Sequence, residues 1–165
     1  METRQENIRK VAELIKDIKM AMLTTVDDEG SLRSRPMATQ HTEFDGTLWF
    51  FTRASAPKVD EVQQEHEVNV SYADPGSNTF VSISGSAQLV RDPAKIKELW
   101  TPALKAWFPQ GQDDPEVALL KIDVDKAEYW DSPHGKVVQL IGYAKALATG
   151  QTYQPGPGEH DKVRL

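Results

Sequence analysis

In the first third of the chain, a hydrophobic spacing typical of a helix is followed by hydrophobic patterns typical of strands. From Arg4 to Lys19 the apolar residues recur three and four positions apart, which predicts an amphipathic helix. The segments after it are short, apolar or alternating, and separated by Asp- and Gly-containing turns. We expect strands over 20–26, 31–40 and 47–52, with turns at 27–30 and 43–46. The first two strands form a predicted hairpin.

The rest of the chain continues the strand pattern with helices between. Ser55-Ala56-Pro57 and Asp92-Pro93 are helix-start signals, because a capping side chain precedes a proline that fits the first turn. Gly85, inside a strand pattern, indicates a bulge or a close approach by another group. The predicted helices are 56–65, one from Asp92 that carries Trp100, Trp107 and Phe108, and 136–150, and the predicted strands are 67–73, 79–90 and 117–131.

At least six strands joined by short turns, with helices at the margins, predict a mainly β protein with peripheral helices, built as a small antiparallel barrel. The length of 165 residues suits one domain. A net charge of −6 argues against a nucleic-acid partner, and the absence of cysteine excludes disulfides and thiol chemistry. The chain begins with charged residues and has no apolar run of membrane-spanning length. We therefore expect a soluble, cytoplasmic protein with no membrane partner.

Arg33 and Arg35 lie two positions apart and so project from one face of their strand. Charges that protect an edge strand explain the pair at least as well as a ligand site does, and Pro36 is itself an edge residue. The segment "FTRASAPK" (51–58) adds Ser55 and Lys58 at a helix start, where anions bind readily. If strands 31–39 and 47–53 pair, Arg35 meets these residues and could hold a small phosphate with them.

Other chemistry finds little support. The four histidines, His41, His66, His134 and His160, have no zinc-ligand spacing and are interpreted as surface or hydrogen-bonding residues. No Gly-rich phosphate loop and no G-x-S-x-G elbow is present. Trp100 and Trp107 suit a core or an interface, whereas Trp130, at a strand end, suits a ligand or partner contact equally well as a structural role.

Taken in order, "GSLRSRPMA", "LWFFTRASAPK", "VSISGSA" and "LWTPALKAWFPQGQDDPEVALLKIDVDKAEYWD" resemble the FMN-binding split-barrel superfamily of pyridoxamine-phosphate oxidases, in its bacterial general stress protein branch. The resemblance implies a six-stranded antiparallel split β-barrel over residues 1–150, followed by a C-terminal tail, 151–165. It also implies a homodimer with FMN at the subunit interface.

The resemblance assigns cofactor-binding positions. Arg35 resembles the arginine that opens the flavin-contacting strand, Phe51 and Thr52 resemble contacts from the next strand, and Trp130 would approach the flavin from the partner subunit. Ser55 and Lys58 fall where the family places phosphate ligands. The full implied set is Arg35, Pro36, Met37, Ala38, Thr39, Phe51, Thr52, Ser55, Lys58 and Trp130. Arg33 stays undecided between phosphate and solvent, and no catalytic or metal residue is assigned.

One departure bears on function. The substrate-clamping Arg-Leu-x-Pro-x-Arg type of segment of true pyridoxamine-phosphate oxidases is missing, because the chain ends "EHDKVRL". Vitamin B6 oxidation is therefore not expected. The remaining hypotheses are an FMN-dependent oxidoreductase of undefined substrate, cycling with a nicotinamide or small organic redox partner, and a flavin-binding or flavin-sensing protein without turnover. A related barrel that holds haem or a deazaflavin is a third.

Overall fold

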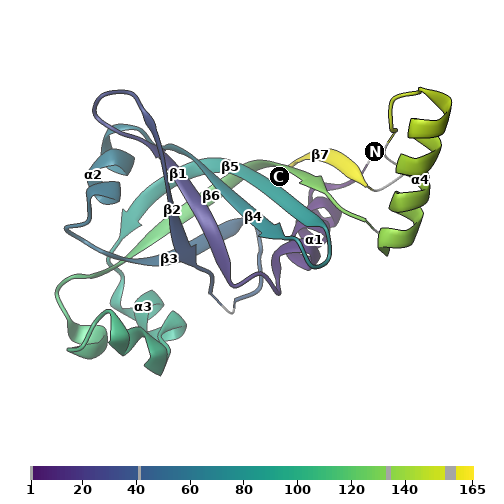
Figure 1. The fold of residues 1–165 in the computed structure, drawn as a ribbon. Helices are drawn as coiled ribbons and strands as arrows, with labels where there is room; N and C mark the ends of the chain where they lie inside the picture. Colours follow the sequence, from purple (N-terminus) through teal and green to yellow (C-terminus); the bar gives the residue numbers. More distant parts are fainter. Residues whose placement is uncertain (1, 41, 133–134, 155–158) are drawn as a thin grey trace.

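The computed structural model of the chain describes residues 2–40, 42–132, 135–154 and 159–165. The strands form one antiparallel, strongly curled sheet in the order β2-β1-β4-β5-β6-β3, and β7 pairs with β6 beside this path (Figure 1). Helix α2 lies at one end of β1 and β2, and α1 lies near the other end. The mainly β architecture with a split antiparallel barrel, expected from the sequence, is confirmed.

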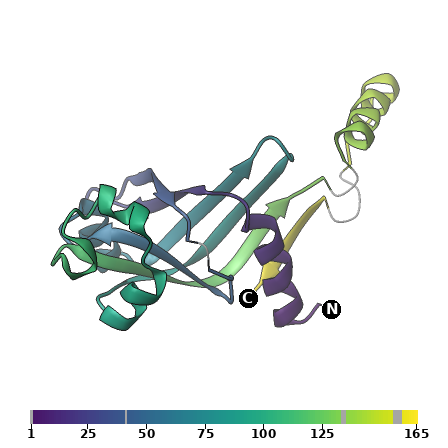
Figure 2. The ribbon, with the colours of Figure 1, turned by 90° about the horizontal axis from the view of Figure 1, so that it is seen from below.

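The elements have the following bounds. The strands are β1 Met20–Val26, β2 Leu32–Ala38, β3 Thr47–Arg53, β4 Glu67–Asp74, β5 Thr79–Val90, β6 Val117–Trp130 and β7 His160–Arg164. The α-helices are α1 Arg4–Ile15, α2 Pro57–Gln64, α3 Pro93–Leu99 and α4 Gly135–Thr149, and two 3₁₀ turns span Pro102–Ala106 and Gly111–Asp113. Helix α4 stands apart from the sheet in both views (Figure 2).

Helix α1 covers one end of the sheet with its apolar face. A capping box between Thr3 and Glu6 starts the helix, and Val11, at the centre of the buried face, is fully buried. The helix ends at Ile15, four residues before the predicted end, and the Ile18 amide then donates to the Ile15 carbonyl as the chain turns into β1. The buried face of α1 completes the main core, which fills the concave side of the sheet.

The hairpin of β1 and β2 is confirmed, with Arg35 opposite Leu23 and Pro36 opposite Met22. The hypothesis that β2 pairs with β3 is wrong. Strand β3 pairs with β6, and β2 and β3 are the two ends of the strand order, with no ladder joining them among the described residues. The barrel is split there: β2 and β3 lie near each other because the sheet curls, but they form no ladder among the described residues.

Gly85 is both a bulge and a point of close approach, as predicted. The register of β5 on β6 shifts between Ser84 and Gly85. A Cβ atom placed on Gly85 would lie 2.3 Å from the Asp123 carbonyl oxygen, so the opposite backbone occupies the space that a side chain needs.

Two helix predictions need correction. Ser55 does not cap α2, because Ala56 is the N-cap residue, and among the described residues the start of this helix has no side-chain capping hydrogen bond. The helix that begins at Asp92 and Pro93 ends at Leu99, so it carries none of Trp100, Trp107 and Phe108, and Trp100 is its C-cap residue. Pro102 explains the break, since proline disfavours helical geometry in the residue before it and has no amide hydrogen to donate.

The C-terminal segment contains a strand that the sequence pattern did not reveal. Strand β7 pairs with the second half of β6, from Lys126 opposite Arg164 to Trp130 opposite His160. The Asn7 side-chain amide of α1 also donates to the Arg164 carbonyl at 3.1 Å. The end of the chain is thereby fixed to both the sheet and the first helix.

Candidate functional site

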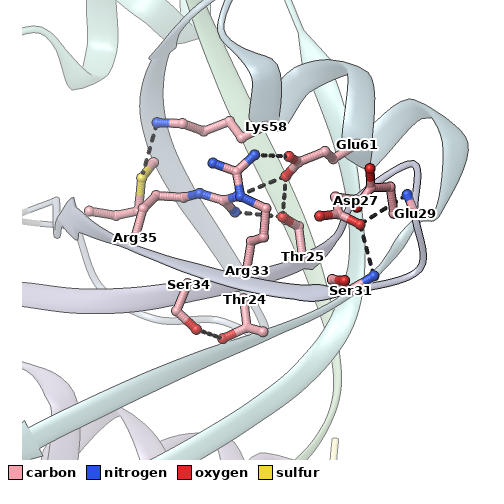
Figure 3. Close-up of polar contacts among 11 residues, drawn as sticks. Thr24, Thr25, Asp27, Glu29, Ser31, Arg33, Ser34, Arg35, Lys58 and Glu61 are labelled. Carbon is pink, nitrogen blue, oxygen red and sulfur yellow. Dashed lines mark hydrogen bonds and ion pairs between the residues drawn. The ribbon is translucent and has the colours of Figure 1, made fainter.

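The alternation of β2 sends Arg33, Arg35 and Met37 to one face of the strand, toward helix α2. Ser34 points the other way and bonds with Thr24 of β1 at 2.6 Å. Figure 3 shows both guanidinium groups reaching from β2 to the carboxylate of Glu61 on α2. The predicted shared face of the two arginines is therefore present, and the helix supplies the group that it faces.

Glu61 is the centre of this cluster. Its carboxylate accepts from Arg35 at 2.7 Å, from Arg33 at 2.8 Å and from the Thr25 hydroxyl at 2.5 Å. Arg35 also donates to the Thr25 hydroxyl oxygen at 2.6 Å. Glu61 is 7% exposed, whereas the Arg33 side chain is 54% exposed, so the cluster reaches from the interior to solvent.

The charges of the cluster do not cancel. Burial opposes ionisation of Glu61, but the Thr25 hydrogen bond and the two guanidinium groups outweigh it and hold the pKa of this carboxyl below its usual value. One carboxylate thus faces the two guanidinium groups, and Lys58 stands on the same helix one turn earlier. With Lys58 protonated, the four side chains carry a net charge of +2.

Lys58 is half-buried, and its ammonium group lies 3.5 Å from the Met37 sulfur. Burial lowers the pKa of Lys58, and the nearby charge of Arg35 lowers it further. No carboxylate pairs with Lys58 among the described residues. The charge of this ammonium is therefore not neutralised by a carboxylate, so it is available to attract an anion beside Arg35.

Ser55 and Thr52 do not point into the cluster. The Ser55 hydroxyl donates to Glu116 of the loop before β6 at 2.5 Å, and this bond lowers the pKa of Glu116. Thr52 is 4% exposed, and its hydroxyl donates to the Arg53 carbonyl at 3.3 Å. Of the residues expected at the phosphate, Arg35 and Lys58 come together, and Ser55 contacts a different group.

Phe51 faces away from Thr52, as strand alternation requires. Its ring packs edge-on against Trp100 with centroids 6.0 Å apart, in a satellite core beneath α3. Trp107 remains 60% exposed. The side chain of Phe51 is therefore packed, partly buried, against this satellite core.

Trp130 lies at the far end of β6 from the cluster. Trp130 pairs with Phe80 of β5, and β4 and β1 lie between β5 and β2, so Trp130 is four strands from β2, about 19 Å across the sheet. The Trp130 ring is 41% exposed and stacks on His160 with centroids 5.1 Å apart. One chain does not bring Trp130 to Arg35, so a shared site requires two chains.

Apolar residues continue from the cluster onto the opposite face of the hairpin. Met20 and Met22 are 52% and 41% exposed, and they lie across the ladder from Ala38 and Pro36. Beyond Ala38, the Thr39 hydroxyl donates to the Ile18 carbonyl at 2.8 Å. The stretch 35–39 thus separates a cationic face from an apolar one, along a strand whose outer edge has no partner among the described residues.

Other site types are not supported. Within the described residues, no group of three or more His, Asp or Glu side chains is arranged to hold a metal ion. His160 bonds Glu128 at 2.7 Å and His66 is exposed, while His41 and His134 lie outside the described residues. In the part of the chain that the structure describes, no helix is long and apolar enough to cross a membrane.

Sequence reasoning missed Glu61 and Thr25, which organise the cluster. Glu61 follows Lys58 by three positions on the predicted helix, so the two share a helix face. That spacing was a usable signal, but the approach of α2 to β2 depends on the fold. Thr25 offered no signal beyond its place in a buried strand.

Comparison with known proteins gives a consistent result. The family described as pyridoxamine 5′-phosphate oxidase like matches residues 6–154. General stress protein 26 of Bacillus subtilis is 30% identical over 125 residues, which cover 72% of this chain and 85% of that protein.

Two solved structures share the fold. One, from Jannaschia sp. CCS1 and provisionally assigned as general stress protein 26, has a TM-score of 0.71 at 26% identity, covering 95% of this chain and 97% of the other. The general stress FMN/FAD binding protein of Xanthomonas citri has a TM-score of 0.65 at 32% identity, covering 76% and 89%. Sequence and fold together show that the chain belongs to the pyridoxamine 5′-phosphate oxidase-like family, among relatives that include general stress proteins.

Proposed function

We propose that this protein binds FMN as a homodimer and acts as a flavin-dependent oxidoreductase in a stress response. The observation that carries the proposal is the charge of the cluster of Arg33, Arg35, Lys58 and Glu61. A net charge of +2 at the boundary between interior and solvent complements a phosphate monoester, whose charge near neutral pH is about −1.5 to −2. The Xanthomonas citri relative, described as FMN/FAD binding, supports a flavin as the molecule that carries this phosphate.

The residues present fit the cofactor in kind. The Arg35 guanidinium donates to Thr25 and Glu61 and has further N–H groups that can bind phosphate oxygens, and Lys58 adds an ammonium not neutralised by a carboxylate among the described residues. From Arg35 to Thr39 the strand extends about 13 Å, which suits a ligand with a phosphate at one end and a ring system at the other. The main chain of residues 36–39 would line the ring.

When bound, FMN supplies the redox chemistry of such a site, and the protein contributes binding, orientation and hydrogen bonds to the ring. Arg35 and Lys58 would hold the phosphate end. Glu61 keeps the two guanidinium groups on the α2 side of β2, so the phosphate-binding groups are positioned before the cofactor arrives.

Two features support the homodimer. Met20, Met22, Pro36 and Ala38 form an apolar surface on the hairpin that carries Arg35. Within one chain Trp130 lies four strands from β2, about 19 Å across the sheet, so a contact between Trp130 and a cofactor at β2 would come from a second chain. Two copies related by a twofold axis would bury the apolar surface and place each Trp130 near the other chain's cofactor.

The test of cofactor binding is spectroscopic. The purified protein is expected to be yellow or to bind added FMN, with flavin absorbance that elutes together with the protein. The double variant Arg35→Ala/Lys58→Ala should bind FMN at least about 100-fold more weakly, since each charge-assisted contact contributes about 1.5–3 kcal/mol. A colourless protein that takes up no FMN would refute the proposal, as would a double variant with wild-type affinity.

A second measurement separates an oxidoreductase from a flavin-binding protein without turnover. Anaerobic addition of NADH, NADPH or a small organic reductant should bleach the flavin repeatedly when an acceptor is present. Bound flavin that no donor reduces would favour the carrier or sensor role. The visible spectrum also distinguishes FMN from haem and from a deazaflavin.

A further inference from the structure

A cavity of about 440 Å³ lies between α1, the segment that follows β2, and β3. It shares Thr39 with the predicted flavin-binding stretch, but it does not include Arg35 or Lys58. Its inner wall is formed by Phe44, Phe50 and Tyr72, all buried, and Trp49 adds a fourth aromatic side chain. The volume is within the usual range for small-molecule sites, and most such sites are largely apolar with a few polar groups.

Tyr72 gives this cavity one distinctive polar group. The residue is 3% exposed, yet its hydroxyl has no hydrogen-bond partner among the described residues. Burial raises the pKa of Tyr72, so the hydroxyl stays protonated and can donate. Among the described residues the Asn7 amide oxygen is the one buried side-chain polar atom without a partner, so the Tyr72 hydroxyl keeps contact with water, and a ligand oxygen in the cavity could take the place of that water.

The other polar groups of the lining are engaged or exposed. The hydroxyls of Thr39 and Thr47 donate to Ile18 and Asp123, and at the rim Lys16 pairs with Glu13 at 2.8 Å. Among the described residues the inner wall therefore carries no charged side chain, and its donors without a protein partner are the Tyr72 hydroxyl and the Trp49 indole N–H. A charged ligand would lose its hydration there without a compensating partner, whereas flat aromatic surface would pack against the aromatic side chains.

We propose that this cavity binds a neutral, flat aromatic compound with a carbonyl oxygen that accepts a hydrogen bond from Tyr72. This site is separate from the flavin site, and the proposal stands whether or not the protein binds FMN. It names a class of small molecule that the protein can hold beside the far end of the stretch 35–39.

The probes for a test are 2-acetylnaphthalene, naphthalene and 2-naphthoate, which share a ring system and differ in the carbonyl group and the charge. Each is titrated into ¹⁵N-labelled full-length protein and followed by amide chemical shifts, with and without FMN. We expect 2-acetylnaphthalene to bind with shifts centred on residues 39–50, naphthalene to bind less tightly, and 2-naphthoate to bind least.

Tyr72→Phe removes the hydroxyl and keeps the ring. It should weaken binding of 2-acetylnaphthalene about fivefold and leave naphthalene binding unchanged. Tyr129→Phe is the matched control, because Tyr129 is equally buried but does not line the cavity. Ala12→Phe should block all three probes, since Ala12 of α1 lines the cavity and a phenyl ring there would fill it.

Several results would overturn the proposal. They are the absence of binding, equal affinities of 2-acetylnaphthalene for wild type and Tyr72→Phe, and shifts that map away from the cavity. Displacement of the probe by FMN would also overturn it, because the cavity would then hold the flavin ring. Failure of FMN to bind would count against the proposed function and leave this inference standing if the probe still binds.

Discussion

Replacing Glu61 with Gln tests the organisation of the cationic cluster. The change keeps the shape of the side chain and removes the charge that holds Arg33 and Arg35. The exposed Arg33 pair contributes at most about 1 kcal/mol, whereas Arg35 is mostly buried and would be left beside Lys58 without its counter-charge. Breaking a fully buried pair costs about 3–5 kcal/mol. Because one side of this cluster faces solvent, the low end of that range applies.

We therefore expect Glu61→Gln to lower the free energy of unfolding by about 3 kcal/mol. In a protein of this size that corresponds to a fall in Tm of about 6–12 °C. Thermal unfolding should be measured without flavin and at one protein concentration, because a cofactor or a partner subunit also stabilises the folded state. Asp60→Asn is the control, since Asp60 is an exposed acid on the same helix.

The pH dependence gives an independent check. The pKa of Glu61 is lower in the folded protein than the usual value of 4.5, so its stabilisation is complete above that value. It is lost as the pH falls through the folded-state pKa. The stability difference between wild type and Glu61→Gln should therefore be constant from pH 7 to about 5 and shrink in more acidic solution. An unchanged Tm, or a difference that persists unaltered to strongly acidic pH, would refute the reasoning.

Three further predictions concern the cofactor, the dimer and the sheet. FMN should bind about tenfold more weakly at pH 5 than at pH 7 in a fluorescence titration, because its phosphate takes up a proton near pH 6 while Glu61 stays ionised. Riboflavin, which has no phosphate, is the control and should show no such change. Met22→Glu places a charge beside Pro36 in the apolar surface and should give a monomer by light scattering that also loses FMN; a dimer that keeps FMN would contradict this. Gly85→Ala should lower stability by about 3 kcal/mol in urea unfolding, because the new methyl group overlaps the Asp123 carbonyl, and a loss below about 1 kcal/mol would show that the backbones separate easily.

Local signals in the sequence predicted the features that depend on neighbouring residues. The β1–β2 hairpin follows from a turn between two apolar strands, and the bulge at Gly85 follows from a glycine inside a strand. The shared face of Arg33 and Arg35 follows from strand alternation alone, and the structure has it.

Features that depend on distant segments were not predictable in this way. Glu61 meets Arg35 only because α2 packs over the end of the hairpin, and nothing in the residues near Glu61 specifies that approach. The assumed pairing of β2 with β3 was wrong because the partner of β3 is β6, more than 60 residues further along. Strand β7 was missed because His160–Arg164 is short and mostly polar, so its composition does not indicate a strand. Its strand conformation is stabilised by pairing with β6.

The pairing of β6 with β7 has a consequence for the newly made chain. Thirty residues separate Trp130 from His160, so the second half of β6 emerges from the ribosome well before its partner. At about 5–20 residues per second, this delay lasts roughly 2–6 seconds. During that time the backbone of residues 126–130 is an open edge, beside the exposed rings of Phe80 and Trp130. Protection of this edge by a chaperone should therefore raise the yield of soluble protein. Slow synthesis in the cold, which lengthens the delay, should lower that yield, and neither changes the stability of the finished fold.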